Sequence, residues 1–346
     1  MNGLHNWPDS HYLDPGKSFM KTLVLNGVRD LSMVQRPTPC PGPGEQLLEV
    51  LFCGVCKTDA KMWDQGHRDL VLPRVMGHEA VVVDEQARKF VIWPGKSCGQ
   101  CLHCRKGREN LCDFMEIMGF HNDGGFADFV IAPGESLIPV PDNITPLTAC
   151  FAEPMGCVFN AVSKLGLEPG QRVLIYGGGT VGLIAALVCR DLGGEVCVIE
   201  KDQAKIQRLA PFLQKKDILC TGETQESDFH CVINACPDPE AFGMGISKAG
   251  KGSRYAFFSG LAKDKALDTN LLNLVHYREI SLVGAYGLTR QNMVDALAAM
   301  EEHQNFLAML VQQTIPLDRV DSIMPAVLSG VGCKYVVDFR TSDETN

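Results

Sequence analysis

The chain has 346 residues, of which 45% are apolar and 21% charged, and this balance excludes a disordered, collagen-like or coiled-coil protein. Its 34 glycines and 19 prolines indicate many tight turns and argue against an all-helical bundle. The formal net charge of −9 argues against a nucleic-acid partner, whose phosphates favour a basic surface.

Cysteine usage and the first residues bear on the cellular compartment. Residues 1–19 are polar and contain two prolines, so they do not resemble a secretory signal, and no stretch reaches the roughly 18 apolar residues of a membrane span. We therefore expect a cytoplasmic protein with reduced thiols. Its 15 cysteines are then metal ligands or core residues rather than disulfides.

In chain order, the first predicted elements are strands. Residues 20–25 form one strand, which leaves the residues before it as a loose extension, and residues 47–53 form another. Short strands separated by turn signals continue to about residue 141 and predict a β-rich barrel or sandwich. A helix is expected over about residues 146–165, with Glu153 inside it.

The pattern changes at Gln171, where apolar strands begin to alternate with helices. This alternation predicts βαβ units with a parallel sheet. The expected strands are 172–176, 196–199, 231–235, 255–258 and 280–285, with a last strand at 334–339. The expected helices are 183–192, which Gly193-Gly194 would end, and 292–300.

Four cysteines follow a C-x2-C-x2-C-x7-C pattern: Cys98, Cys101, Cys104 and Cys112. Four thiolates on one short loop match a closed, structural tetrahedral Zn²⁺ site. Four unrelated free cysteines and an iron–sulfur cluster are the alternatives. The seven-residue fourth spacing, with no proline after the last cysteine, disfavours the cluster.

A glycine-rich turn predicts a dinucleotide site. Gly177, Gly179 and Gly182 satisfy G-x-G-x-x-G between a strand and a helix, and Glu200 ends the next strand 18 residues later. The helix N-terminus would face the pyrophosphate. A carboxylate at Glu200 would bind the ribose hydroxyls and favour NAD over NADP, a preference that Lys201 moderates. The alternative is a purely structural glycine turn.

Three separated segments suggest a second metal site. Cys56 lies in G-V-C-K-T-D, His78 in G-H-E, and Glu153 before a proline. Thiolate, imidazole and carboxylate are all zinc ligands, and three of them plus water make a catalytic site. Taken singly, each residue is equally compatible with a structural role.

The order of these motifs, together with D-G-G-F-A at residues 123–127, resembles the zinc-dependent medium-chain dehydrogenases. Within them it is most similar to the polyol (sorbitol-type) and threonine dehydrogenase branch, over residues 20–339. The resemblance implies an α/β chain with a GroES-like β-rich catalytic domain, residues 1–156 and 286–346, which carries the structural zinc lobe. It implies a Rossmann NAD-binding domain with a doubly wound parallel sheet, residues 157–285. It also implies a homodimer or homotetramer that pairs strand 280–285.

The resemblance assigns roles to the metal-site residues. Cys56, His78 and Glu153 would hold the catalytic zinc, with Glu153 bound directly or through water. Glu79 would lie beside the metal and enter when ligands exchange. Cys53 would be structural.

The resemblance also assigns a proton path and a cofactor site. Asp59 would bond the ring N–H of His78, and Thr58 would accept the alcohol proton. Lys61 replaces a histidine that ends the proton relay in many relatives, so this relay depends on a lysine that can lose its proton. The implied cofactor-binding residues are Gly177, Gly179, Thr180, Val181, Gly182, Glu200 and Lys205.

Two segments are shorter than in typical relatives. One is residues 79–98, and the other is residues 222–229, where relatives usually fit a helix. The second segment predicts a shortened crossover.

The sequence therefore predicts an NAD-dependent zinc oxidoreductase acting on a secondary alcohol, with a polyol or sugar alcohol as first choice and two zinc ions per chain. Threonine, another amino alcohol or a sugar phosphate is the alternative substrate. A zinc-knuckle protein that binds nucleic acid or a partner is the alternative from another class, suggested by the basic residues around 98–112. A dehydrogenase scaffold without activity is the third.

Overall fold

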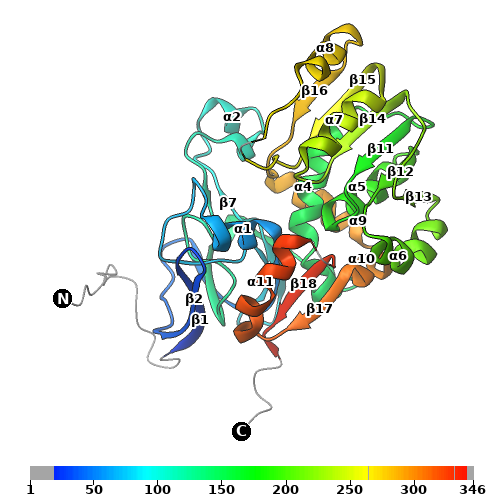
Figure 1. Ribbon diagram of the computed structural model, residues 1–346. Helices are drawn as coiled ribbons and strands as arrows, with labels where there is room; N and C mark the ends of the chain where they lie inside the picture. Colours follow the sequence, from blue (N-terminus) through cyan, green and yellow to red (C-terminus); the bar gives the residue numbers. More distant parts are fainter. Residues whose placement is uncertain (1–18, 264, 331, 341–346) are drawn as a thin grey trace. The chain divides into compact units, whose positions relative to one another are not determined.

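The computed structural model describes residues 19–263, 265–330 and 332–340 (Figure 1). The expected loose extension before residue 20 lies almost wholly outside these residues. Two compact units divide the chain: Met1–Glu153 with Leu297–Asn346, and Pro154–Ala296. The domain boundaries expected from the sequence, after residues 156 and 285, stay a prediction; the two compact units divide after Glu153 and after Ala296.

The first unit is built on a seven-stranded sheet to which both ends of the chain contribute. Its order is β10-β6-β5-β3-β18-β17, with β9 paired to β3. These strands are β10 (Leu137–Pro139), β6 (Lys89–Ile92), β5 (Glu79–Val83), β3 (Glu45–Val55), β18 (Lys334–Asp338), β17 (Val311–Ile315) and β9 (Phe129–Pro133). The antiparallel pairing of β3 with β18 confirms both predicted strands and places residues almost 300 positions apart in direct contact.

A three-stranded sheet and a pair of packed helices also belong to this unit, together with the two-stranded sheet of β7 (Gly95–Lys96) and β8 (Glu116–Ile117) and the helices α2 (Leu102–Arg105) and α10 (Gln304–Leu310). The three-stranded sheet has the order β2-β1-β4, namely Asp30–Arg36, Met20–Gly27 and Arg74–Val75. Helix α1 (Lys57–Gln65) packs against α11 (Val320–Ser329), and the indole Nε1 of Trp63 donates to Asp321 at 3.1 Å. The apolar core between these elements includes the fully buried Leu25, Met62 and Phe126.

The helix expected over residues 146–165 is wrong as a single element. The chain forms two helices, α3 (Pro146–Ala149) and α4 (Ala152–Ser163). Pro154 explains the break, because its missing N–H and its ring are incompatible with the interior of a continuous helix but are tolerated in a first turn. The break places Glu153 at the start of α4 rather than in mid-helix.

The second unit has the predicted doubly wound parallel sheet, in the order β13-β12-β11-β14-β15-β16. The strands are β13 (Ile218–Thr221), β12 (Glu195–Ile199), β11 (Arg172–Tyr176), β14 (Phe229–Asn234), β15 (Ala249–Phe257) and β16 (Ser281–Gly284), all paired in parallel. The helices that follow strands are α5 (Thr180–Asp191), α6 (Gln203–Lys215), α7 (Pro239–Lys248) and α8 (Thr269–Tyr277), with α9 (Arg290–Met300) after the sheet. The order reverses between β11 and β14, which is where such sheets bind ligands.

The crossover from β13 to β14 is short, as expected. Residues 222–228 contain no helix, although they lead from the edge of the sheet past β12 and β11. Arg172 anchors this segment: its guanidinium donates to the Ser227 carbonyl at 3.1 Å, pairs with Glu226 and lies 4.6 Å from the ring of Phe229.

Across the part of the chain that the structure describes, every helix is too short or too polar to cross a membrane.

Candidate active site

A thiol, an imidazole and a carboxylate converge in the first unit. Ligand atoms of Cys56, His78 and Glu79 all lie within 4.8 Å of one another. His78 and Glu79 lie at the start of β5, which pairs with β3 through Gly54 and Glu79. The cluster therefore forms where β3 ends and α1 begins. Its sulfur, nitrogen and oxygen donors suit zinc.

The start of α1 fixes the position of Cys56. Its Sγ caps the helix by accepting the Thr58 N–H at 3.4 Å. In return, Asp59 accepts the Cys56 N–H at 2.8 Å, so the two residues form a reciprocal cap. Thr58 thus lies next to the thiol, and Lys61 lies half-buried further along the same helix.

Asp59 also orients His78. Its Oδ1 lies 3.3 Å from His78 Nδ1, and the Asp59 side chain is completely buried. Burial opposes the charged imidazole, but Asp59 and Cys56 outweigh it and raise the pKa of His78 well above its usual value. Because Nδ1 faces Asp59, Nε2 is the ring nitrogen left for a metal.

A buried lysine that the sequence analysis missed lies against the same cluster. Lys334 Nζ donates to both carboxylate oxygens of Glu79, at 2.7 and 2.6 Å, and both side chains are at most 5% exposed. Burial opposes the ammonium, yet Glu79, Cys56 and Glu153 together raise the pKa of Lys334 above its usual value. The one sequence signal was a lysine at the start of a short strand whose next three residues, 335–337, are apolar.

Glu153 lies outside the three-residue group that the structure assembles. It is 8% exposed at the first turn of α4, and its charge acts on Lys334. Its role as a metal ligand stays a prediction. The aromatic ring of Phe120 is a further neighbour that no sequence signal indicated, 5.6 Å from the imidazole of His78 and 5.4 Å from that of His67.

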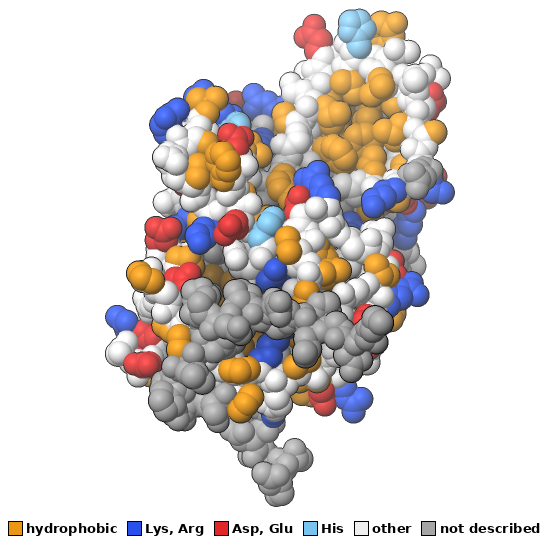
Figure 2. All heavy atoms as spheres, turned by 90° about the vertical axis from the view of Figure 1, so that its left-hand side faces the viewer, with side chains coloured by type: hydrophobic (Ala, Val, Ile, Leu, Met, Phe, Trp, Pro, Cys, Tyr) orange, Lys and Arg blue, Asp and Glu red, His pale blue; other side chains and the backbone are white. Residues whose placement is uncertain are grey.

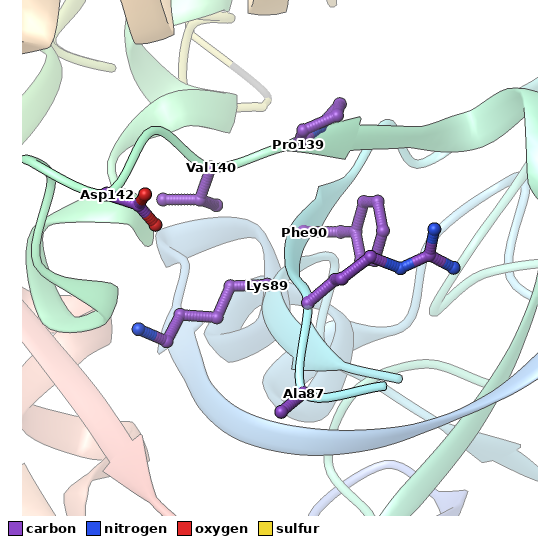
Figure 3. Close-up of a pocket in the computed structure, with 7 residues that line it drawn as sticks. Ala87, Lys89, Phe90, Pro139, Val140 and Asp142 are labelled. Carbon is purple, nitrogen blue, oxygen red and sulfur yellow. The ribbon is translucent and has the colours of Figure 1, made fainter. Parts of the chain in front are cut away.

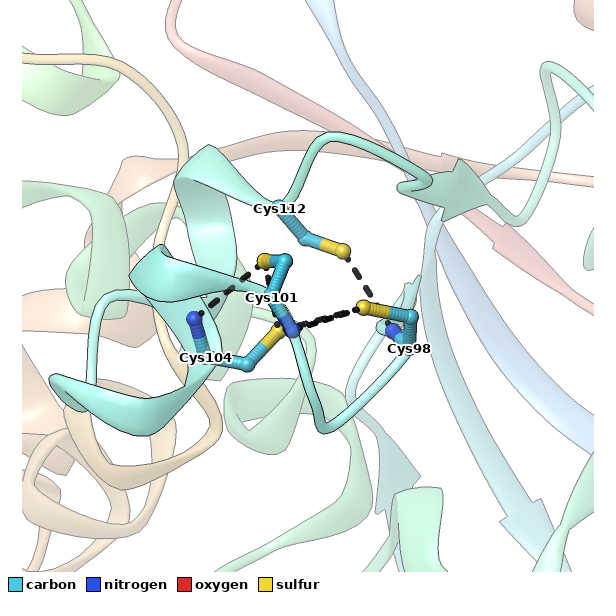
Figure 4. Close-up of side chains that lie close together, drawn as sticks. All are labelled: Cys98, Cys101, Cys104 and Cys112. Atoms are coloured by element: carbon cyan, nitrogen blue, oxygen red, sulfur yellow. Dashed lines mark hydrogen bonds between the residues drawn. The ribbon is translucent and has the colours of Figure 1, made fainter.

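The four lobe cysteines point toward a common centre (Figure 4). Their sulfurs lie within 4.8 Å of one another, including 3.5 Å between Cys101 and Cys104, and none forms a disulfide. Backbone N–H groups point at the sulfurs, at 3.3 Å from Cys98 to Cys112 and from Cys101 to Cys98. Chiefly through the N–H of Cys104, they lower the pKa of the Cys101 thiol to about 6. Four sulfurs in this arrangement fit a closed zinc site.

The glycine turn of the second unit leaves space for a ligand. Gly177 has φ +107°, and a Cβ on Gly182 would come within 1.8 Å of the Gly177 carbonyl oxygen. A Cβ on Gly179 would meet nothing within 4 Å. Gly179 also caps α5 without a side-chain hydrogen bond, so Thr180 and Val181 begin a helix with free N–H donors.

Glu200 lies against this turn. Its Oε2 accepts the Gly178 N–H and the Lys205 ammonium, each at 3.1 Å, and both side chains are largely buried. Lys201 instead pairs with Asp238 at 2.7 Å. The predicted acidic residue therefore lies beside the predicted phosphate turn, with Lys205 as its counter-ion.

Two other hollows share none of the predicted site residues. One of about 370 Å³ lies between β6 and β10 in the first unit (Figure 3) and is lined by Ala87, Arg88, Lys89, Phe90, Pro139, Val140 and Asp142. The other, of about 590 Å³, is lined mainly by α7, α8 and the residues just before α8.

Comparisons with known proteins agree with this architecture. Residues 42–142 match the alcohol dehydrogenase GroES-like domain, and residues 150–238 match the alanine dehydrogenase/PNT C-terminal domain. These matches confirm the predicted fold class.

Several curated relatives are named dehydrogenases. A sorbitol dehydrogenase of Halalkalibacterium halodurans is 27% identical over 92% of this chain and 99% of its own. An L-threonine 3-dehydrogenase of Deinococcus radiodurans is 26% identical over 90% and 96%. An L-galactonate-5-dehydrogenase of Escherichia coli is 31% identical, but the match spans 57% of this chain and only 61% of that protein.

Solved structures share the fold. A zinc-binding dehydrogenase of Sinorhizobium meliloti, bound to NADP, superposes with a TM-score of 0.83 at 23% identity, over 93% of this chain and 99% of that one.

Proposed function

Because the chain belongs to the zinc-dependent medium-chain dehydrogenases, in their polyol and threonine dehydrogenase branch, we propose that it transfers hydride between a secondary alcohol and NAD. The observation that carries the proposal is the convergence of Cys56, His78 and the buried carboxylate of Glu79, with Asp59 beside His78.

A zinc ion at this site supplies a Lewis acid that makes an alcohol more acidic, and NAD supplies the hydride acceptor. The chain's own residues set up the reaction. Asp59 fixes the tautomer of His78, while the start of α1 directs the Cys56 thiolate inward. Thr58, next to Cys56, accepts the alcohol proton, and Lys61 passes it toward solvent.

The four-cysteine lobe holds the second, structural zinc ion. All four of its ligands are sulfurs, so no position is open for substrate. We assign it to stabilising the loop over residues 98–112.

For the cofactor we propose NAD rather than NADP. A 2′-phosphate would bring negative charge to the Glu200 carboxylate, while the cation next in sequence, Lys201, is already paired with Asp238. Comparing the dissociation constants of NADH and NADPH by fluorescence tests this choice. Equal or tighter binding of NADPH would contradict it.

The substrate class rests on the relatives. Sorbitol and D-altritol dehydrogenases favour a polyol or sugar alcohol, and the threonine dehydrogenases keep an amino alcohol as the second candidate. We place the enzyme in the cytoplasm, where NAD is available.

We also propose a homo-oligomer that pairs β16 across a two-fold axis. This strand is one edge of the sheet, and no side chain of helix α8 is fully buried, although Leu271, Leu274 and Val275 pack partly against the core. Leu272, Tyr277 and Leu282 are among the exposed apolar residues of this edge, and Figure 2 shows apolar side chains gathered at the upper right of that face. A second copy would cover this patch.

The deciding experiment measures NADH formation by the zinc-loaded protein with polyols, sugar alcohols, sugar phosphates and threonine. We expect turnover with a polyol or sugar alcohol, and its loss in Cys56→Ser with NADH binding retained. No turnover with any secondary alcohol, despite bound zinc and NADH, would contradict the proposal.

A further inference from the structure

Two lysines lie beside the predicted ribose site at Glu200, and each is paired with a carboxylate. Lys205 donates to Glu200 at 3.1 Å, and its side chain is only 7% exposed. Lys201, the residue after Glu200, donates instead to Asp238 at 2.7 Å, and its side chain is 70% exposed. Lys201 is therefore the cation of the two that can turn toward a new anion without leaving a buried position.

The pair of Lys201 and Asp238 joins the two segments that flank the glycine turn. Strand β11, which leads into the turn, lies between β12 and β14 in the sheet (Figure 1). Lys201 follows β12, one residue after Glu200, and Asp238 follows β14. A Cβ on Gly177 would lie 3.0 Å from the Cβ of Cys236, so the second segment contacts the turn as well. The Lys201 ammonium is thus bound to the far side of the turn, where α7 begins.

Helix α7 fixes the carboxylate that binds this lysine. Asp238 is the N-cap residue of α7, where its Oδ1 accepts the Glu240 N–H at 2.9 Å while Oδ2 faces Lys201. The hydrogen bond from Lys201 is the main cause that lowers the pKa of Asp238, and the same bond raises the pKa of Lys201. Both groups are therefore charged at neutral pH.

We propose that Asp238 is a positioning residue for cofactor specificity, which keeps the Lys201 ammonium on α7 and so prevents it from serving a 2′-phosphate beside Glu200. This inference rests on the proposed function, because it presupposes a dinucleotide whose ribose lies at Glu200.

Electrostatics gives the direction of the effect. A 2′-phosphate is an anion that a lysine binds as a point charge. To reach it, Lys201 must leave Asp238, so NADPH exchanges one ion pair for another and also meets the Glu200 carboxylate. NADH leaves the pair of Lys201 and Asp238 undisturbed. Neutralising Asp238 should therefore favour NADPH selectively.

The test measures the dissociation constants of NADH and NADPH by fluorescence titration at low ionic strength. We expect Asp238→Asn to bind NADPH about 3- to 10-fold more tightly than the wild-type protein, and NADH within about twofold. Asparagine still caps α7, so the fold is retained. Asp238→Glu, which keeps the charge, should restore the wild-type ratio of the two constants. The gain in Asp238→Asn should shrink at high salt.

Loss of the Asp238 charge also reduces repulsion of a phosphate, and a double variant separates this effect from release of the lysine. Lys201→Met/Asp238→Asn should return to about the wild-type NADPH affinity, because the released cation is gone. Asp268→Asn, which makes the same change at the N-cap of α8, is the matched control and should leave both constants unchanged.

Two results would overturn the inference alone: an unchanged ratio of the two constants in Asp238→Asn, or a gain in NADPH affinity that persists in the double variant. In both, the wild-type protein would still prefer NADH and the proposed function would stand. A wild-type protein that binds NADPH as tightly as NADH, or that binds neither, would overturn the inference together with the proposed cofactor.

Discussion

Asp59 combines two tasks at the residue scale. One oxygen accepts the Cys56 N–H at the start of α1, and the other faces His78 Nδ1 at 3.3 Å. We expect Asp59→Asn to weaken metal affinity about 10- to 100-fold. The neutral amide replaces the charged carboxylate that faces His78 Nδ1, so it holds the imidazole less firmly in the orientation that binds metal. Metal competition with a chromophoric chelator measures this. Asp64→Asn, on the exposed side of α1, is the control, and equal affinities in both variants would contradict the assignment.

Removal of zinc from the four-cysteine lobe should reveal that Cys101 and Cys104 differ in thiol pKa and therefore in reactivity. In zinc-free protein the backbone N–H of Cys104 stabilises the Cys101 thiolate and brings its pKa to about 6, whereas burial raises the pKa of Cys104 to about 11. Thiolate, the reactive form, increases as pH rises through the pKa. At pH 7.5 iodoacetamide should therefore modify Cys101 before Cys104, and its rate should fall below about pH 6.

Tandem mass spectrometry over time measures this order, because fragmentation locates the modified cysteine within the tryptic peptide 97–105 that contains both residues. Zinc-loaded protein is the control and should be protected at all four positions. Modification of Cys104 before Cys101 would contradict the order of their pKa values, and equal rates with and without zinc would contradict a four-sulfur zinc site.

At the scale of elements, two glycines of the cofactor turn have different roles: Gly182 is needed for packing, and Gly179 leaves space for the cofactor. A Cβ on Gly182 would clash with the Gly177 carbonyl oxygen, whereas a Cβ on Gly179 would enter open space. We expect Gly182→Ala to destabilise the protein by more than about 1 kcal/mol, since backbone must shift. Gly179→Ala should keep its melting temperature within a few degrees and lose NADH affinity about tenfold or more.

Thermal unfolding and NADH fluorescence titration, run on both variants, distinguish these effects. The proposed cofactor turn would be contradicted if Gly179→Ala bound NADH as tightly as the wild-type protein.

Most elements of the second unit were predictable because their signals are local. The strand 172–176 follows from its apolar run. The short crossover, expected over residues 222–229, follows from the few residues between two predicted strands and from the longer segment of typical relatives. The prediction of one helix over residues 146–165 was wrong. The residues on both sides of Pro154 favour helix, and this hid the break that the proline causes one turn before it. Local periodicity therefore identifies elements well, but a proline can either begin a helix or break one.

For the whole molecule, the site was predictable only in part. Cys56 and His78 belong to short motifs, so the sequence indicated them. Lys334 lies 255 residues from Glu79 and reaches it only because β18 pairs with β3 next to β5. No spacing rule encodes such a contact. Its discovery required the strand order, in which distant segments become neighbours.

The proposed oligomer can be tested by placing a charge on either edge strand of the six-stranded sheet, β16 or β13. Leu282 on β16 is 39% exposed and Leu219 on β13 is 56% exposed, so an aspartate fits at either position without entering the core. A two-fold axis would present the charge at 282 twice across the same contact. We expect Leu282→Asp to weaken the dimer at least 100-fold, about 3 kcal/mol, and Leu219→Asp to leave it intact. Light scattering after size-exclusion chromatography, over a dilution series, gives both masses. Dissociation of the Leu219→Asp protein instead would place the interface on the opposite edge, and an unchanged mass in both variants would remove β16 from it.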